Sequence, residues 1–153
     1  IAAELRARGI EVPDAPLRLD SYGDSPELSA ELLELIRSGR KRAGASLLWA
    51  YAYEDEPLPA VGQVEVVLDH RAEPALLTRV TAVEVLPFQE VSAAYAAREG
   101  EGDCSLAYWR ESHWAFFTRE CARIGREPTV EMPVVCVDFE LLAVVDGSSA
   151  SES

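Results

Sequence analysis

Residues 38–46 read SGRKRAGAS, a basic stretch that contains two glycines and joins a helical pattern to an apolar one. Four of the chain's 14 basic residues fall within six positions here: Arg37, Arg40, Lys41 and Arg42. Gly39 would end the preceding helix, and Gly44 would let a ligand approach the backbone closely. The order of a phosphate-binding P-loop, GxxxxGK[ST], is absent. Two explanations stay open: a ligand site, or basic side chains that complement the dipole of a helix end.

Lys41 is the only lysine in the chain, and every other basic residue is an arginine. The chain also has no asparagine, and both absences indicate coding in GC-rich codons. A lysine kept against this bias predicts a position where a compact ammonium is needed, because a guanidinium is larger and always charged. The alternative is a surface residue that survived by chance.

The segments around this stretch predict a mixture of helices and strands. Ser25-Pro26-Glu27 is typical of a helix start, and the helix would bury one apolar stripe and end at Gly39. Strands are expected over residues 45–53, 63–69, 75–86 and 133–145, the last being one strand or a pair. Helices are expected over 88–98 and 105–124. Strands and helices do not alternate regularly, so the predicted class is α+β with a mixed or barrel-like sheet.

The length and composition predict one folded domain. Of the 153 residues, 27 are acidic and 14 basic, which gives a net charge of −13. A broad nucleic-acid surface is therefore not expected, although a small local basic site is compatible with this charge. We expect an N-terminal arm over residues 1–18, a core domain over 19–145 and a disordered acidic tail over 146–153. No apolar run is long enough to span a membrane, and three cysteines without metal-ligand spacing predict reduced thiols in the cytoplasm.

Glu99, Glu101 and Asp103 alternate with glycine between the two predicted C-terminal helices. Alternating acids resemble the first half of a calcium loop, but Arg110 stands where the final glutamate of such a loop belongs. We therefore expect no metal site. Asp103 fits a cap for the following helix, whereas Glu99 is free to serve a site or to pair with Lys41.

Tyr22 and Trp49 flank the helix that leads to Lys41, and we expect them to stack against a base. His113 shares the inner face of the long helix with Trp109, where a hydrogen-bonded core histidine is favoured over a catalytic one. The sequence contains no Ser-His-Asp order, no HExxH and no paired Cys/His metal motif.

Five separated motifs carry a resemblance to a known family: Tyr22-Gly23-Asp24-Ser25, Ser38–Ala43, Val83–Phe88, Glu99–Trp109 and Pro133–Val137. In this order they resemble the ASCH domain of the PUA-like superfamily, over about residues 19–142. The chain is most similar to bacterial single-domain ASCH proteins, which are described as RNA-binding. The resemblance implies a small PUA-like β-barrel of mixed strands with flanking helices, and a cleft beside Lys41.

The resemblance also implies two chemistries. Some small bacterial ASCH proteins hydrolyse the acyl-amide of N4-acetylcytidine-type nucleosides with a lysine, a threonine three residues later and a glutamate. Lys41 matches the lysine, and Glu99, or else Glu101, matches the glutamate. The threonine position falls on Gly44, which has no hydroxyl, and Ser46 would lie about 7 Å further along a strand. Another ASCH branch cuts single-stranded RNA with metal assistance.

The sequence thus predicts a binding module for RNA or a modified nucleoside, with a small cationic cleft around Lys41. The candidate catalytic residues are Lys41, Glu99 and Glu101. The candidate ligand-binding residues are Tyr22, Asp24, Arg40, Arg42, Gly44, Ser46 and Trp49. Three alternatives stay open: an amidohydrolase of N4-acylated cytidine nucleosides weakened by Gly44, a metal-assisted ribonuclease and a protein-interaction adaptor. No cofactor is expected, and a homodimer is left open.

Overall fold

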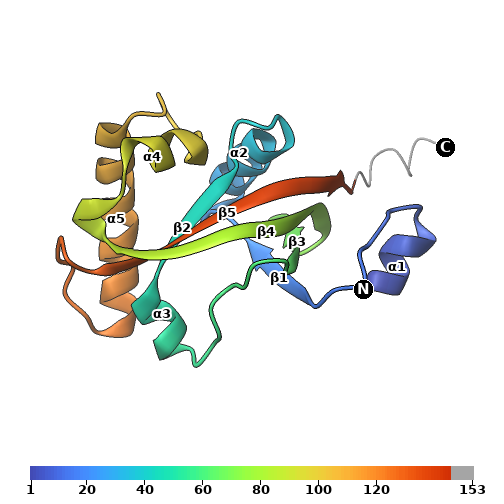
Figure 1. The fold of residues 1–153 in the computed structure, drawn as a ribbon, viewed down its shortest axis with the longest axis horizontal. Helices are drawn as coiled ribbons and strands as arrows, with labels where there is room; N and C mark the ends of the chain where they lie inside the picture. The colour runs from blue at the N-terminus through green and yellow to red at the C-terminus, as the bar shows by residue number, and fades with distance from the viewer. Residues whose placement is uncertain (146–153) are drawn as a thin grey trace.

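A mixed five-stranded sheet forms the centre of the computed structural model, which describes residues 1–145 (Figure 1). The strands lie in the order β1 (Leu17–Ser21), β3 (Val64–Leu68), β4 (Pro74–Pro87), β5 (Pro133–Val144) and β2 (Ala43–Leu47). β1 and β3 are parallel, and the other neighbouring strands are antiparallel. The predicted α+β class is confirmed, with the sheet curled into a half-barrel.

Five α-helices flank this sheet in the described part of the chain (Figure 1). They are α1 (Ala2–Ala7), α2 (Pro26–Arg37), α3 (Leu48–Tyr53), α4 (Ala93–Glu99) and α5 (Leu106–Ile124). A short 3-10 helix, Phe88–Glu90, precedes α4. No helix within residues 1–145 combines the length and the apolar character that crossing a membrane requires.

The start of α2 follows from its sequence as predicted. The Ser25 hydroxyl accepts a hydrogen bond from the Leu28 backbone N–H at 3.1 Å, and Pro26 occupies the first helical position. Leu33 and Ile36 bury one face of the helix against the sheet. This face fixes where the chain leaves α2 and therefore where Lys41 lies, just before β2.

The sheet curls because its two long strands pair irregularly. β4 and β5 pair from Leu76–Val144 to Pro87–Pro133, and the register shifts between Leu77 and Thr78 and between Val80 and Ala82. Such bulges increase the local twist and bend the strand. The bend lets one face of the sheet wrap around a cleft.

The strand predicted over residues 45–53 is wrong in its second half. β2 ends at Leu47, and α3 follows at once from Leu48 to Tyr53. The antiparallel partner β5 starts at Pro133, one residue from the last pair, Leu47–Val134, so later residues have no strand to pair with. An apolar run of this length does not distinguish a strand from a buried helix, and here the helix satisfies the backbone.

Two other segments differ in detail from the prediction. The single helix expected over residues 88–98 is divided into the 3-10 helix and α4, because the Ser92 side chain caps a new helix at the Tyr95 N–H. The N-terminal segment forms α1, and Leu5 and Val12 pack on the sheet face opposite the cleft. β1 lies in a segment for which no strand was expected. The expected acidic tail, 146–153, lies outside the described residues.

The two faces of the sheet bury different clusters. On the α1 side, Val64, Val66 and Leu77 pack together with Leu5. On the other side, Val67, Leu76 and Phe139 pack under Leu33 and Ile36 of α2. The alternation along β3 also turns Glu65 to the same side as Val67, toward the cleft.

Candidate functional site

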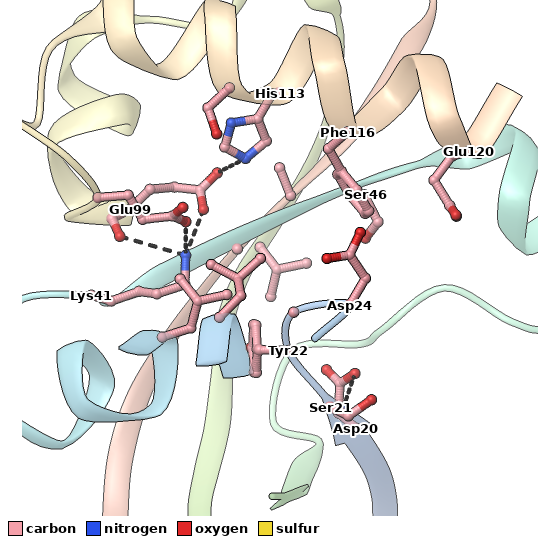
Figure 2. A pocket seen from close by; sticks show the side chains of 18 of the residues that line it. Asp20, Ser21, Tyr22, Asp24, Lys41, Ser46, Glu99, His113, Phe116 and Glu120 are labelled. Atoms are coloured by element: carbon pink, nitrogen blue, oxygen red, sulfur yellow. Dashed lines mark hydrogen bonds and ion pairs between the residues drawn. The ribbon is translucent and has the colours of Figure 1, made fainter. Parts of the chain in front are cut away.

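A cleft of about 930 Å³ is lined by residues of β1, α2, β2, α3, β3 and α5 and by the loop that follows α4 (Figure 2). Lys41 and Glu99 lie at one end of it, and Asp20 lies across the cleft from them. The volume falls within the range typical of small-molecule sites. The cleft is therefore large enough for a nucleoside-sized ligand.

The Lys41 ammonium is buried between two carboxylates. Its Nζ donates to Glu99 Oε1 at 2.6 Å, to Glu101 Oε2 at 2.7 Å and to the Glu99 carbonyl at 3.5 Å. Lys41 is 2% exposed and Glu99 is 1% exposed. An ammonium has three protons to donate, and all three face acceptors here. The lone lysine is therefore a buried, paired residue in the wall of the cleft rather than a surface residue.

The second oxygen of Glu99 is held by α5. Trp109 Nε1 donates to Glu99 Oε2 at 2.7 Å, and His113 Nε2 lies 3.1 Å from the same oxygen. The other ring nitrogen of His113, Nδ1, lies 3.0 Å from the Trp109 carbonyl, and the two rings stack at 4.2 Å between centroids. His113 is thus a hydrogen-bonded, buried histidine, and it is also part of the site.

Charge pairing within this network opposes the cost of burial. Burial alone would lower the pKa of Lys41, but the Glu99 and Glu101 charges outweigh it and hold that pKa above its usual value. Burial alone would raise the pKa of Glu99, but Lys41 and His113 hold it well below the usual range. The pair is therefore ionised across the physiological pH range.

Backbone contacts bring the loop after α4 to the start of β2. Gly100 ends α4 in the left-handed region, with φ of 70°, and a Cβ there would collide with the Arg40 carbonyl. The Arg42 N–H donates to the Arg98 carbonyl at 2.8 Å. The Tyr95 hydroxyl donates to the Gly44 carbonyl at 2.7 Å. Glycine at position 100 is what allows Glu99 to reach Lys41.

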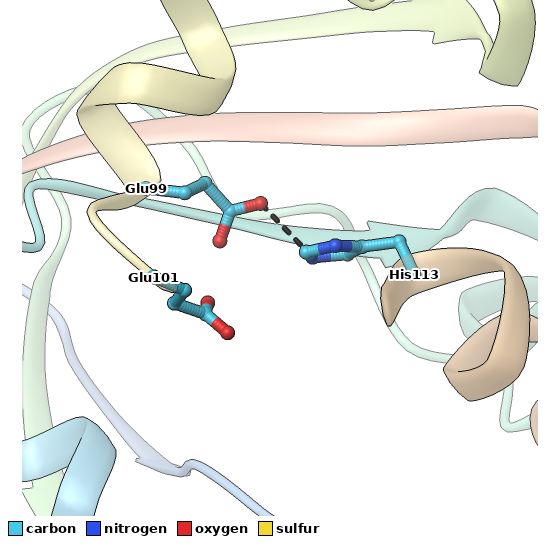
Figure 3. A group of neighbouring side chains, drawn as sticks. All are labelled: Glu99, Glu101 and His113. Atoms are coloured by element: carbon cyan, nitrogen blue, oxygen red, sulfur yellow. Dashed lines mark ion pairs between the residues drawn. The ribbon is translucent and has the colours of Figure 1, made fainter. Parts of the chain in front are cut away.

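Glu99, Glu101 and His113 offer ligand atoms within 4.8 Å of one another, a grouping that could hold a cation (Figure 3). The position between the two carboxylates is taken by the Lys41 ammonium. A divalent ion would have to displace that ammonium or share its carboxylates. The site as built supplies its own positive charge.

The structure brings most of the predicted site residues to one cleft. Lining it are Lys41, Glu99, Glu101, Tyr22, Asp24, Arg40, Gly44 and Ser46. Arg40 donates to the Gly102 carbonyl at 2.7 Å and so braces the acidic loop. Two predicted residues are not among the lining residues: Arg42 is exposed outside the cleft, and Trp49 packs under the Arg126 guanidinium, 4.5 Å from its ring centroid.

Tyr22 fills the space beside Gly44. A Cβ built on Gly44 would lie 3.4 Å from Tyr22 Cε1 and 3.6 Å from its hydroxyl. Gly44 is not among the glycines with positive φ, so its backbone would accept another residue. The phenol ring, and not the backbone, limits the side chain at this position. Burial holds the pKa of Tyr22 well above its usual range, so its hydroxyl stays protonated and can donate.

Acidic side chains outnumber basic ones around the cleft. The lining acids include Asp20, Glu31 and Glu65, in addition to the pair that holds Lys41. Sequence reasoning missed Glu65 and its neighbour Tyr51, whose hydroxyl lies 3.1 Å from Ser46 Oγ. Their positions depend on β1 and α3, the two elements that the pattern did not predict.

Comparison with known protein families and solved structures identifies the family to which the chain belongs. The model of the ASCH domain matches residues 18–143. The chain belongs to the ASCH-domain family. The crystal structure of an ASCH domain from Lactobacillus crispatus JV V101 is 35% identical, with a TM-score of 0.78, over 83% of this chain and 80% of that one. The PUA-like expectation for the fold is thereby confirmed.

Two further structures extend the comparison of this ASCH protein. A protein from Enterococcus faecalis V583 is 32% identical, with a TM-score of 0.82, over 99% of this chain and 90% of that chain. The ASCH protein from Zymomonas mobilis is 12% identical, with a TM-score of 0.54, over 91% of this chain and 79% of that chain, a likeness of fold alone. No curated protein matches the chain.

Proposed function

We propose that this ASCH protein binds a modified nucleoside, or a short single-stranded RNA segment, in the cleft beside Lys41. The observation that carries the proposal is the buried network of Lys41, Glu99 and His113, which is held rigidly at the wall of a nucleoside-sized cleft. Small-ligand sites use fixed polar groups of this kind for orientation, beside aromatic and apolar side chains such as Tyr22 and Phe116. The family fold supports a role linked to RNA. The free cysteines support a location in the cytoplasm.

Aromatic side chains offer stacking surfaces in this cleft. Tyr108 and Phe116 of α5 face it from one side and Tyr22 from the other. Base–aromatic stacking is sequence-tolerant and contributes roughly 1–3 kcal/mol per base. We infer that the base stacks in the cleft, while its polar edge meets the charged network.

The charge of the cleft favours a nucleoside over a long RNA. The positive charge expected around Lys41 is neutralised locally, because Glu99 and Glu101 both form ion pairs with its ammonium. Phosphate contacts need cations that are free to pair with them. Of the two arginines next to Lys41 in the sequence, Arg40 already donates to the Gly102 carbonyl and Arg42 lies outside the cleft. We therefore place the base and sugar in the cleft, with any phosphates outside.

Amide hydrolysis is a weaker candidate on the same geometry. A nucleophile needs a base within hydrogen-bond reach, and the Lys41 ammonium is protonated and fully engaged. Gly44 supplies no hydroxyl, and the raised pKa of Tyr22 makes its phenol a poor nucleophile. The Ser46 hydroxyl contacts the Tyr51 hydroxyl and not a base, which leaves a water molecule activated by Glu99 or Glu101 to attack, so we expect slow turnover at most.

A binding panel tests the proposal. Purified protein is titrated with free nucleosides, including N4-acetylcytidine, and with short single-stranded and duplex RNAs, and binding is followed by calorimetry. Tyr108→Ala removes an exposed tyrosine that lines the cleft, and Tyr53→Ala removes an exposed tyrosine outside it. We expect saturable nucleoside binding that is weakened about tenfold or more by the first change only. Failure of every nucleoside and single strand to bind would refute the proposal.

A further inference from the structure

Glu65 is a buried acid with no partner, at the end of the cleft away from Lys41. It is 3% exposed, lies on β3 and lines the cleft. No hydrogen bond or ion pair reaches its carboxyl from any residue in the range 1–145, and because its oxygens are not among the fully buried unsatisfied atoms, they open onto the cleft. A buried carboxyl in a natural protein normally has donors to satisfy it. Nothing in the described fold supplies them to Glu65.

The nearest cation is directed elsewhere. Arg18 on β1 is the register neighbour of Glu65, yet its guanidinium donates to the Pro57 carbonyl at 3.1 Å and to the Glu56 carboxylate at 3.4 Å. On the other neighbouring strand the partner of Glu65 is Thr78, which is fully buried and whose hydroxyl has no hydrogen-bond partner. The protein groups around Glu65 therefore supply no donor to its carboxyl, which is left to water or a ligand in the cleft.

Acceptors and flat rings surround this end of the cleft. Burial, and the nearby charge of Asp20, raise the pKa of Glu65 to about 7, whereas Arg18 opposes this only in part. The charges of Asp20 and Arg18 act on Glu65, and the charge of Glu65 acts on the hydroxyls of Tyr22 and Tyr51. A ligand that presents negative charge would be repelled here by Asp20 and by the Glu65 carboxylate. A flat ligand that presents donors would be accepted.

We propose that the Glu65 end of the cleft is a subsite for a planar edge with two adjacent N–H groups, which the Glu65 carboxylate accepts together. The guanine edge of a nucleoside and an amidine share this chemistry. Two parallel N–H···O bonds to one carboxylate are the strong, bidentate form of a charge-assisted hydrogen bond. The proposal rests on the proposed function for its nucleoside ligands, but the amidine arm of the test does not.

The first arm compares matched ligands and matched variants. Guanosine carries both N–H groups, inosine lacks the amino group, and benzamidine carries an amidine edge without any nucleoside. Glu65→Gln removes one acceptor in place, and Glu31→Gln makes the same change at an exposed position that lines the same cleft. We expect guanosine to bind about tenfold or more tightly than inosine, and Glu65→Gln alone to remove this preference and to weaken benzamidine by a similar factor.

The second arm measures the number of protons released when the ligand binds, and it uses the wild-type protein alone. Glu65 has a pKa of about 7, so it is about half protonated at pH 7, and a ligand that needs the carboxylate releases about half a proton on binding. Calorimetry of benzamidine in two buffers of different ionisation enthalpy reports this number. Affinity is expected to rise with pH up to about 7 and then to level off.

The outcomes separate this subsite from the proposed function. Binding of benzamidine with proton release, without binding of any nucleoside or single-stranded RNA, supports the subsite and refutes the proposed function. Nucleoside binding with equal affinity for guanosine and inosine and no change in Glu65→Gln overturns the subsite and leaves the proposed function standing. Absence of benzamidine binding to the wild-type protein, or binding that takes up protons, also overturns the subsite.

Discussion

Individual acidic and basic residues in the cleft make opposite contributions to stability. Glu99 and Lys41 satisfy each other, whereas Glu65 is buried without a donor. A protein that keeps such an acid loses stability at neutral pH, and a ligand site is a physical reason to keep it. The clearest residue-scale test is therefore a stability measurement without any ligand.

Glu65→Gln should stabilise the protein at pH 8 and have little effect at pH 4. The folded protein holds the Glu65 pKa at about 7 instead of 4.5, so the unfolded chain binds fewer protons between these values. The loss of folding free energy caused by Glu65 is absent below pH 4.5, the pKa of this group in the unfolded chain, and it grows as the pH rises. It is complete above about pH 7, where it reaches at most about 3 kcal/mol. Denaturant unfolding at the two pH values measures it. Equal effects at both would contradict the shift.

Lys41→Arg should destabilise the protein although the charge is kept. The ammonium sits 2.6 and 2.7 Å from its two carboxylates in a position that is 2% exposed, and a guanidinium needs more room. Overpacking of this kind costs about 1–3 kcal/mol. Arg37→Lys, an exposed change on α2, is the control and should stay within about 0.5 kcal/mol. If Lys41→Arg left the free energy of unfolding unchanged, either basic side chain would be sufficient at this position.

At the scale of elements, the site depends on how helix α4 ends against strand β2. Gly100 and Gly125 both end helices in the left-handed region, with φ of 70° and 76°. A Cβ on Gly100 would strike the Arg40 carbonyl, whereas a Cβ on Gly125 meets nothing within 4 Å. Alanine substitutions at these two glycines therefore distinguish the destabilisation caused by backbone strain, which both share, from that caused by the steric collision, which only Gly100 has.

Gly100→Ala should therefore be much more harmful than Gly125→Ala. We expect about 1 kcal/mol of destabilisation from the conformational strain at Gly125, and at least about 2 kcal/mol more at Gly100 because the acidic loop must move away from Lys41. Thermal unfolding of both variants measures the difference. Equal losses would mean that the loop and the start of β2 do not need their close approach.

The same elements show what the sequence could and could not predict. The Ser25 cap, the glycine that ends α5 and the uniqueness of Lys41 are local signals, and each was informative. Glu65 looks like an ordinary solvent-facing residue in an alternating strand, because its burial comes from β1 and α3. β1 is a five-residue strand stabilised by parallel pairing with a distant segment, and no local pattern encodes that.

The site network divides in the same way. Pairing of Lys41 with Glu99 could be expected from the family resemblance, but the Trp109 and His113 bonds to Glu99 could not. They require α4 and α5 to meet at an angle that only the whole fold sets. A buried helical face predicts that His113 is inside, and it does not predict what His113 touches.

For the whole molecule, net charge governs which nucleic acids can bind. With a charge of −13 and a cleft rich in acids, the protein should bind long duplex RNA weakly, and raising the salt from 50 to 200 mM should weaken any such binding further. Free nucleosides carry no phosphate, so their affinity should change little over the same range. Filter binding and calorimetry at the two salt concentrations measure both. Tight duplex binding that ignores salt would contradict the charge argument.

The central claim is that the cleft beside Lys41 holds a nucleoside, and a residue-resolved titration tests it most directly. The ¹⁵N-labelled protein is titrated with the tightest nucleoside of the binding panel, and the backbone amide signals are followed by NMR. We predict saturable shifts that concentrate at Gly44, Ser46 and residues 99–102, with little change along α1. Shifts that are absent, that do not saturate, or that gather on α1 and the opposite face of the sheet would contradict the claim.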